Sequence, residues 1–299
     1  MKKKILKILK LILGLCILCF LFSQTSAREF LNLLKNVNYQ WFIFGLILYV
    51  TGQIISAKKW EIISEYLGFK KSFSAYVSMY FLGMFYNSFL PTNIGGDVVK
   101  IVKLNDKSEN SGKRALVSVL FDRLSGVAVL VGFIIVGFMI NNTNNSTLQI
   151  VSYSLILLLI LGCIFTFYIA KHPDIFHSKL KKYIETILVP VFNKDCILGI
   201  VVYSVVFHII VIAIHYCIAQ MFNFPISTSY YLLLYPISAI AAALPISVGG
   251  IGIKEFVYVY MLKMVGIDTS SALIFSLSFS MIILFSSLLG LVPFFNARK

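Results

Sequence analysis

The sequence predicts an all-α integral membrane protein with six full spans and two re-entrant helical hairpins, arranged as two inverted-topology repeats. Three observations lead to this fold class: apolar runs of bilayer length, a motif that occurs twice, and basic residues that gather in alternate loops. Apolar residues make up 59% of the chain and charged residues only 13%. A soluble domain rarely has that composition, whereas a polytopic membrane protein requires it.

One motif occurs in both halves of the chain. The stretch from Leu90 to Lys100 reads LPTNIGGDVVK, and the stretch from Leu244 to Lys254 reads LPISVGGIGIK. Leucine, proline, both glycines and lysine share one register at an offset of 154 residues. Proline cannot continue a helix, and the glycine pair permits backbone angles that a Cβ forbids, so each copy breaks an apolar segment. Paired breaks in corresponding halves of a membrane protein are typical of a transport site.

The N-terminal segment, residues 1–27, resembles a cleaved secretory signal peptide, because lysines precede an apolar run and small residues follow it. Cleavage would remove the repeat partner of the span predicted at 150–170. We therefore expect the segment to remain in the protein as its first span.

The other predicted elements are apolar runs separated by polar turns and basic loops. The first half contains an interfacial turn at 29–38, a span at 41–57, an interfacial segment at 58–71, an apolar stretch at 72–90, the first motif, a basic loop at 100–114 and a span at 116–140. The second half contains a span at 150–170, an amphipathic surface helix at 171–195, apolar stretches at 197–220 and 229–244, the second motif and a last span at 272–294. The two repeats cover about 1–142 and 147–299.

The distribution of basic residues distinguishes two topologies. If both motif segments crossed the membrane fully, the basic loops 100–114 and 171–195 would lie opposite the lysine-rich N-terminus, against the positive-inside rule. If each motif is instead the tip of a re-entrant hairpin, 21 of the 26 lysines and arginines lie on one side and 4 on the other. The hairpin topology therefore fits better. It places both termini in the cytoplasm and makes the halves inverted copies, as in alternating-access carriers.

The candidate substrate-binding residues lie in the two motifs and in the span that follows the first. Both glycine pairs precede a short helix, so we expect them to aim free N–H groups at an anionic phosphate. Lysines at equivalent repeat positions add positive charge, and nearby carboxylates can hold an amine. An acid and a base inside a span are costly in lipid, so they face a cavity or a partner. The candidates are Asn93, Gly95, Gly96, Asp97, Lys100, Asp122, Arg123, Ser247, Gly249, Gly250, Lys254 and Glu255.

Each candidate also has a structural explanation. The motif can be a packing break that binds nothing. Asp122 and Arg123 can form an interfacial or structural salt bridge, and Lys100 can be one more positive-inside anchor. Asn93 and Ser247 can satisfy backbone groups that the breaks release.

Other chemistries have little support in the sequence. Hydrolase, metalloprotease, P-loop and dinucleotide motifs are missing, and the segments between spans are too short to form a catalytic domain, so we expect no catalytic residue, cofactor or metal. The net charge of +14 lies in short loops, which indicates topology and anionic lipid rather than nucleic acid. His208 and His215, seven residues apart, suit a proton relay or simple packing between helices. Five cysteines in or beside apolar runs predict neither a disulfide nor a zinc site: Cys16, Cys19, Cys163, Cys196 and Cys217.

Three stretches resemble the lysylphosphatidylglycerol synthase transmembrane family, which includes the membrane part of multiple peptide resistance factors and many stand-alone relatives. These stretches are the two motifs and the segment Asp122-Arg123-Leu124-Ser125-Gly126. The resemblance covers nearly the whole chain and implies a bacterial or archaeal inner-membrane protein. In the fused forms, a cytosolic domain makes aminoacylated phosphatidylglycerol and the membrane part moves it to the outer leaflet. This sequence contains no aminoacyl-transfer domain, so the resemblance does not imply lysyltransferase activity.

We therefore expect a lipid translocase of the inner membrane. A cavity between the two hairpins would accept a phosphate-headed lipid such as aminoacylated phosphatidylglycerol. Two alternatives stay open: a carrier of polyprenyl-phosphate-linked sugars for cell-envelope glycans, and a non-transporting membrane scaffold for a separate aminoacyl transferase or glycosyltransferase. Both lipid classes present a phosphate and a polar head, so the residues do not separate them.

The hairpin topology predicts which loops are accessible from each side of the membrane. In a variant without native cysteines, a cysteine at Ser108 should react with a membrane-impermeant maleimide only in inside-out vesicles. A cysteine at Ser26 is external in both topologies and serves as the control. Labelling of position 108 in right-side-out vesicles would refute the re-entrant arrangement of the first motif.

Overall fold

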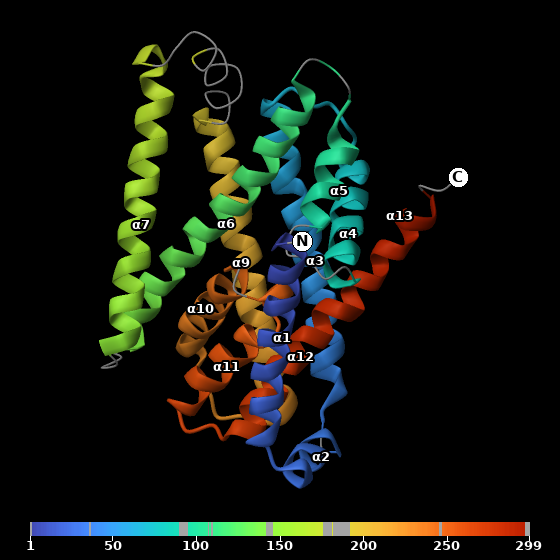
Figure 1. The fold of residues 1–299 in the computed structure, drawn as a ribbon, viewed down its shortest axis with the longest axis vertical. Coiled ribbons are helices and arrows are strands. Elements are labelled where there is room, and N and C mark those ends of the chain that lie inside the picture. Colours follow the sequence, from blue (N-terminus) through green and yellow to red (C-terminus); the bar gives the residue numbers. More distant parts are fainter. Residues whose placement is uncertain are drawn as a thin grey trace. The chain divides into compact units, whose positions relative to one another are not determined.

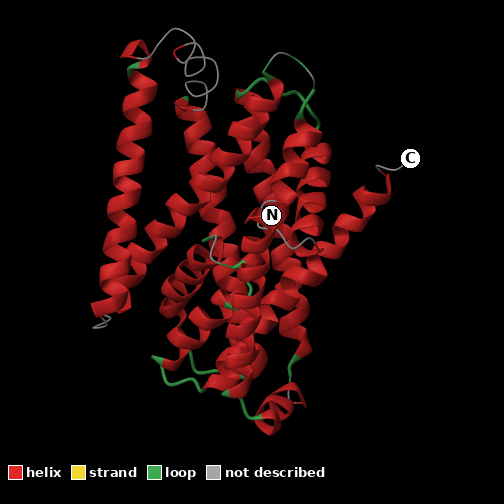
Figure 2. Ribbon diagram, in the orientation of Figure 1, coloured by secondary structure: helices red, strands yellow, loops and turns green. Residues whose placement is uncertain are grey.

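The computed structural model describes residues 2–35, 37–89, 95–106, 108, 110–141, 146–175, 181, 192–244 and 247–296. Every regular element in this part of the chain is helical (Figure 2). Four helices of the described residues are long and apolar enough to cross a membrane: α3 (Tyr39–Tyr66), α6 (Ser111–Asn141), α9 (Lys194–Phe222) and the C-terminal stretch Thr269–Phe295. The all-α membrane class is confirmed for these residues. The number of spans and the re-entrant hairpins remain predictions.

The remaining elements are shorter or belong to that C-terminal stretch. The α-helices are α1 (Lys2–Ser23), α2 (Ala27–Lys35), α4 (Phe73–Phe89), α5 (Gly95–Leu104), α7 (Ser146–Lys171), α10 (Tyr231–Ala243), α11 (Ile253–Lys263), α12 (Thr269–Ser287) and α13 (Leu291–Asn296). The 3-10 turns are η1 (Pro173–Ile175), η4 (Thr228–Tyr230), η5 (Val248–Gly250) and η6 (Leu288–Gly290). Most of the amphipathic helix expected at 171–195 lies outside the described residues.

Local sequence explains where several helices end. Leu244 follows α10 with an extended ψ of 137°, the conformation expected of a residue that precedes proline. Asp268 begins α12, because its carboxylate accepts a hydrogen bond from the Ser271 N–H at 2.9 Å. Gly266, with a φ of 83°, turns the chain between α11 and this cap.

The second predicted span is longer than expected. We placed its end at residue 57 and an interfacial segment at 58–71, but α3 continues to Tyr66. Charged residues interrupt the apolar run without ending the helix, because lysine and glutamate are good helix formers and find partners. Lys58 lies 2.5 Å from Glu61 one turn later, and Trp60 is fully buried.

The order of elements repeats along the chain. Helices α3, α4, α5 and α6 are followed, 155 to 158 residues later, by α9, the η4–α10 pair, α11 and α12. This spacing is close to the offset of 154 residues between the two motifs. The inverted orientation of the halves and the repeat boundaries remain predictions.

The chain divides into two compact units. Unit 1 comprises Met1–Gly52, Phe81–Gly96 and Ile209–Lys299, and unit 2 comprises Gln53–Tyr80 and Asp97–His208. Within unit 1, α11 contacts α1, α10 and α12 (Figure 1). The second motif therefore lies among several helices of its own unit.

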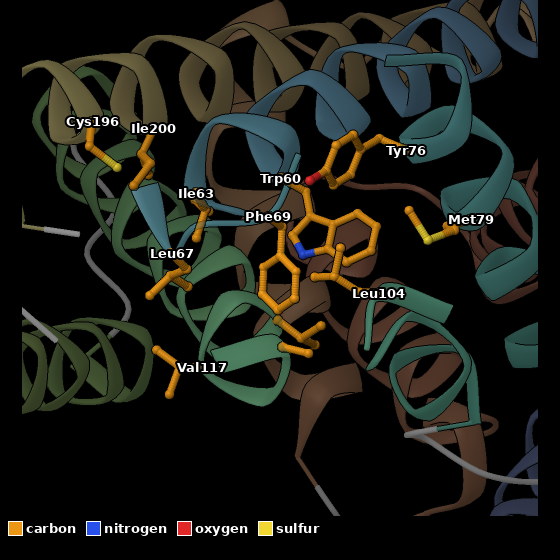
Figure 3. Close-up of a cluster of buried hydrophobic side chains, with 12 residues drawn as sticks. Trp60, Ile63, Leu67, Phe69, Tyr76, Met79, Leu104, Val117, Cys196 and Ile200 are labelled. Carbon is orange, nitrogen blue, oxygen red and sulfur yellow. The ribbon is translucent and has the colours of Figure 1, made fainter. Parts of the chain in front are cut away.

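The core of unit 2 forms around Trp60. Its indole meets the Tyr76 ring edge-to-face, with centroids 5.2 Å apart and an interplanar angle of 89°. Figure 3 shows Phe69 and Leu104 beside the same indole, and both side chains are buried. Such edge-to-face contacts between rings stabilise a fold by more than the burial of their apolar area alone. This core supports the side of α3 that carries Lys59.

Two glycines provide a matched test of helix packing. A Cβ at Gly290 would overlap the Phe81 carbonyl oxygen and lie 2.6 Å from Phe85 Cβ, whereas a Cβ at Gly132 has nothing within 4 Å. We expect Gly290→Ala to lower stability by about 1–3 kcal/mol. Gly132→Ala should be neutral or stabilise by up to about 1 kcal/mol, because alanine is the better helix former.

Thermal unfolding of both variants in detergent measures the difference. Equal melting temperatures for Gly290→Ala and the wild type would contradict the close approach of η6 to α4.

Candidate functional site

The first motif leads into α5, and α5 begins where the chain approaches α4 closely. Residues 90–94, which include the candidate Asn93, lie outside the described residues. The N–H of Gly96 donates to Asn87 Oδ1 at 2.7 Å. A Cβ at Gly96 would overlap the carbonyl oxygen of Gly83. Glycine therefore allows the contact between helices, and the Gly96 amide is capped by the protein rather than free as we expected.

A buried carboxylate lies between two buried lysines in unit 2. One carboxylate oxygen of Asp122, on α6, lies 2.9 Å from Lys59 Nζ, and the other lies 3.5 Å from Lys100 Nζ. The three side chains are at most 6% exposed. Lys59 also donates to the backbone carbonyl of Asp122 at 2.9 Å and to Ser125 Oγ at 3.4 Å. Buried charges are tolerated only with such partners, so the three residues depend on one another.

Aromatic rings surround the Lys100 ammonium. Its Nζ lies 3.2 Å from the centre of the Tyr80 ring and 5.1 Å from that of Trp60, within the range of cation–π attraction. The Tyr80 hydroxyl also donates to Asp122 Oδ2 at 3.3 Å. Trp60 is held by its indole N–H, which donates to Ser118 Oγ at 3.1 Å. Side chains from α3, α4 and α6 therefore orient the lysine of the first motif.

A second ion pair joins α5 to α6. Arg123 Nη2 lies 2.8 Å from Asp97 Oδ1, and the side chains of these residues are 54% and 13% exposed, respectively. Asp97 and Lys100, three residues apart, share one face of α5. The structure thus brings together four candidates from the sequence, Asp97, Lys100, Asp122 and Arg123. Arg123 is the exposed member of the group.

The turn between α5 and α6 is held by a small polar network. Asp106 Oδ1 accepts hydrogen bonds from the Ser108 hydroxyl at 2.6 Å and from the Ser108 N–H at 3.0 Å. Together with Ser111, these donors hold the pKa of the Asp106 carboxyl well below its usual range. Arg114 donates to Ser108 Oγ at 2.7 Å and to the Leu67 carbonyl at 3.1 Å. The turn therefore fixes the relative positions of the two helices that carry the charge pairs.

The second motif forms a tight turn before α11. Gly249, Gly250 and Gly252 have φ angles of 65°, 73° and 83°, in the left-handed region that favours glycine. The Gly252 N–H donates to Glu255 Oε2 at 2.8 Å, so the Glu255 side chain caps α11. Ser247 is buried beside the turn. Glu255, which we considered as a ligand for an amine, has a structural role in this conformation.

Lys254 is neutralised within unit 1. Its Nζ lies 2.7 Å from Ser280 Oγ on α12 and 3.4 Å from Glu255 Oε1. The ammonium is 5.8 Å from the centre of the Phe279 ring. One base therefore faces one acid, and the second motif carries no net charge in this group.

Helix α1 packs directly on the second motif. A Cβ at Gly14 would lie 2.7 Å from the Ile251 carbonyl oxygen, and a Cβ at Gly252 would overlap the carbonyl of Gly14. The two glycines let backbone approach backbone, and α1 contacts both η5 and α11. The segment that resembles a signal peptide is a packed helix of unit 1.

The two histidines of α9 have different surroundings. His215 Nδ1 lies 2.7 Å from the Val211 carbonyl, and Nε2 lies 2.5 Å from the Tyr258 hydroxyl. A carbonyl only accepts, so Nδ1 carries a proton, and Nε2 shares a hydrogen bond with the Tyr258 hydroxyl. His208 is buried in unit 2, where Gly126 lies close to its ring. These contacts describe packed side chains, and the proton relay remains untested.

Lys59 was not among the candidates predicted from the sequence. It completes a charge cluster with Asp97, Lys100, Asp122 and Arg123. Three charged residues between 58 and 61 made this segment look interfacial. In the structure, Gln53, Ser56, Trp60 and Ile63 form a buried face of α3 at helical spacing. Extending the 3.6-residue pattern past the charges would have placed Lys59 next to this face.

Long apolar helices whose breaks carry paired charges define a multi-pass α-helical membrane protein. Among the described residues, no group of three or more His, Cys, Asp or Glu is placed to hold a metal ion. The family described as the lysylphosphatidylglycerol synthase TM region matches residues 7–290. The chain therefore belongs to this family.

Two archaeal relatives share the similarity. A UPF0104 membrane protein from Pyrococcus horikoshii, PH1989, is 22% identical over 299 aligned residues, which cover 89% of each chain. A UPF0104 membrane protein from Archaeoglobus fulgidus is 25% identical over 114 residues, which cover 38% of this chain and 34% of the relative. These names describe membrane proteins without stating a substrate.

The capping role of Glu255 can be tested by stability. Glu255→Ala should destabilise the protein by about 1–2 kcal/mol, because the Gly252 N–H and the Lys254 ammonium lose an acceptor. Glu255→Gln keeps an amide oxygen for the Gly252 N–H and should recover part of the loss. Exposed Glu65→Ala on α3 is the control and should change stability by less than about 0.5 kcal/mol.

Thermal unfolding in detergent is the measurement. A Glu255→Ala protein as stable as the control would contradict the capping role and make Glu255 a candidate substrate ligand again.

Proposed function

We propose that this protein is an inner-membrane translocase that moves a phosphate-headed lipid between leaflets. The observation that carries the proposal is the charge cluster of the first motif. Five charged side chains gather on α3, α5 and α6, where they interrupt or follow apolar runs: Lys59, Asp97, Lys100, Asp122 and Arg123.

The cluster favours an anion. Three bases face two acids, so the group carries one net positive charge when both lysines are protonated. The two buried lysines share the single carboxylate of Asp122, and a phosphate would balance the remaining charge. The partly exposed Arg123 offers a planar guanidinium, which suits the oxygens of a phosphate. The acyl chains of such a lipid would stay in the bilayer.

The repeated order of elements supports transport rather than binding alone. Two broken segments at corresponding positions are typical of carriers that expose one site alternately to each side. The second motif has a glycine-rich turn before α11, and its lysine is paired to Glu255 and hydrogen-bonded to Ser280. We assign phosphate binding to the first motif. The second motif would instead take part in the conformational change that exposes the site to each side of the membrane in turn.

Membership of the family supports a lipid substrate, and aminoacylated phosphatidylglycerol is the first candidate. A polyprenyl-phosphate sugar presents the same phosphate diester and is the competing substrate. A scaffold that moves no lipid is the competing class of function. Lipid exchange in purified vesicles distinguishes all three.

Proteoliposomes with labelled lipids test the proposal. The wild type should accelerate exchange of lysyl-phosphatidylglycerol or phosphatidylglycerol between leaflets. Arg123→Ala should slow the exchange by roughly tenfold or more, because a charge-assisted contact worth about 1.5–3 kcal/mol is lost and Asp97 loses its partner. Arg28→Ala, at an exposed position of α2, is the matched control and should exchange at the wild-type rate.

Three outcomes are informative. Exchange of a polyprenyl-phosphate sugar without exchange of phosphatidylglycerol lipids would move the protein to glycan assembly. No exchange of any lipid would favour the scaffold. Wild-type exchange in well-inserted Arg123→Ala protein would remove the first motif's cluster from the transport path.

A further inference from the structure

Lys59 and Lys100 contact the same carboxylate but are not equivalent. The ammonium of Lys59 donates hydrogen bonds to the Asp122 carbonyl at 2.9 Å and to Ser125 Oγ at 3.4 Å, and it lies 2.9 Å from Asp122 Oδ1 in an ion pair. Lys59 is therefore held in place by two hydrogen bonds and by the closer of the two ion pairs with Asp122.

Lys100 lacks a comparable set of acceptors. Among the described residues, its ammonium donates to one oxygen, Asp122 Oδ2, at 3.5 Å, which is the outer limit of a hydrogen bond. Its other neighbours are the ring faces of Tyr80 and Trp60, which attract a cation but do not occupy a directed N–H donor in the way an oxygen does. A lysine that is 5% exposed thus keeps donor capacity inside the protein.

We propose that the two lysines have different roles. Lys59 is a positioning residue that neutralises Asp122 and keeps its carboxylate from forming a tighter ion pair with Lys100. Lys100 therefore remains free to bind one phosphodiester anion. The lipid as the source of that anion rests on the proposed function. The division of roles between the two lysines rests on the distances alone.

The net charge of the cluster selects the class of anion. One uncompensated positive charge is balanced by a phosphodiester, which carries one negative charge. A phosphomonoester near neutral pH carries about 1.5 to 2 negative charges and would leave an excess of negative charge in a buried site. Phosphodiester lipids should therefore bind more tightly than phosphatidic acid of the same chain length.

A set of neutral substitutions separates the two lysines. The variants are Lys59→Met, Lys100→Met and Asp122→Asn, together with the double variants Lys59→Met/Asp122→Asn and Lys100→Met/Asp122→Asn. Methionine keeps the length and apolar stem of lysine, and asparagine keeps the shape of aspartate. Each purified full-length protein is titrated with short-chain phosphatidylglycerol, and the ligand-dependent rise in melting temperature gives an apparent affinity.

The expected pattern is a selective rescue. Lys59→Met should weaken binding of phosphatidylglycerol roughly tenfold or more, because Asp122 then forms a tighter ion pair with Lys100 and competes with the lipid phosphate. Adding Asp122→Asn to Lys59→Met removes that competitor and should restore most of the affinity. Lys100→Met should weaken binding as strongly, and adding Asp122→Asn to it should restore nothing.

Several outcomes would overturn the assignment. Loss of binding in Lys59→Met that Asp122→Asn does not rescue would make Lys59 a direct ligand or a purely structural residue. Unchanged binding in Lys100→Met would remove Lys100 from the site. Tighter binding of phosphatidic acid than of phosphatidylglycerol would refute the phosphodiester class. A response to inorganic phosphate but not to phosphatidylglycerol would identify a free-anion site instead of a lipid site.

The binding titration and the lipid-exchange assay test the anion site and the translocase separately. A protein that shows the rescue pattern but exchanges no lipid between leaflets would refute the proposed translocase and leave the anion site intact. A protein that exchanges lipid at the wild-type rate with Lys100→Met would refute the present assignment alone.

Discussion

The Asp122 carboxylate is the constraint on which unit 2 depends. A carboxylate buried on a long apolar helix needs cations close by, and these cations come from two other helices, Lys59 on α3 and Lys100 on α5. The aromatic core around Trp60 and the polar turn at Asp106 then hold those helices in place. The ion pairs of Asp122 thus join three helices of the unit next to its apolar core.

The two motifs use glycine in a similar way and differ in their electrostatics. Both use glycine where the chain approaches a neighbouring backbone, and in both a protein side chain accepts from an amide at the break, Asn87 for Gly96 and Glu255 for Gly252. The first motif faces an aspartate on the next helix, whereas the second carries its acid beside its own lysine. Among the described residues, only the first motif therefore lies in a group with an excess of positive charge.

The sequence predicted the class of fold and four members of the cluster, because apolar runs, a repeated motif and charges inside a span are local signals. It missed Lys59, since charge density suggested an interface and only the tertiary fold shows that the neighbours of this lysine are Asp122 and Ser125. It also predicted a free amide at Gly96. The acceptor, Asn87, belongs to the preceding helix, and the sequence does not show that α4 approaches the start of α5.

The glycine contact between α1 and the second motif has a consequence for biogenesis. Gly14 and Gly252 are separated by 238 residues, so α1 is synthesised well before the second motif against which it packs. At about 5–20 residues per second, that interval lasts roughly 12–48 seconds. During this time the face of α1 that carries Gly14 contacts lipid, the insertion machinery or other parts of the nascent chain, so α1 reaches its final packing only after the second motif has been made.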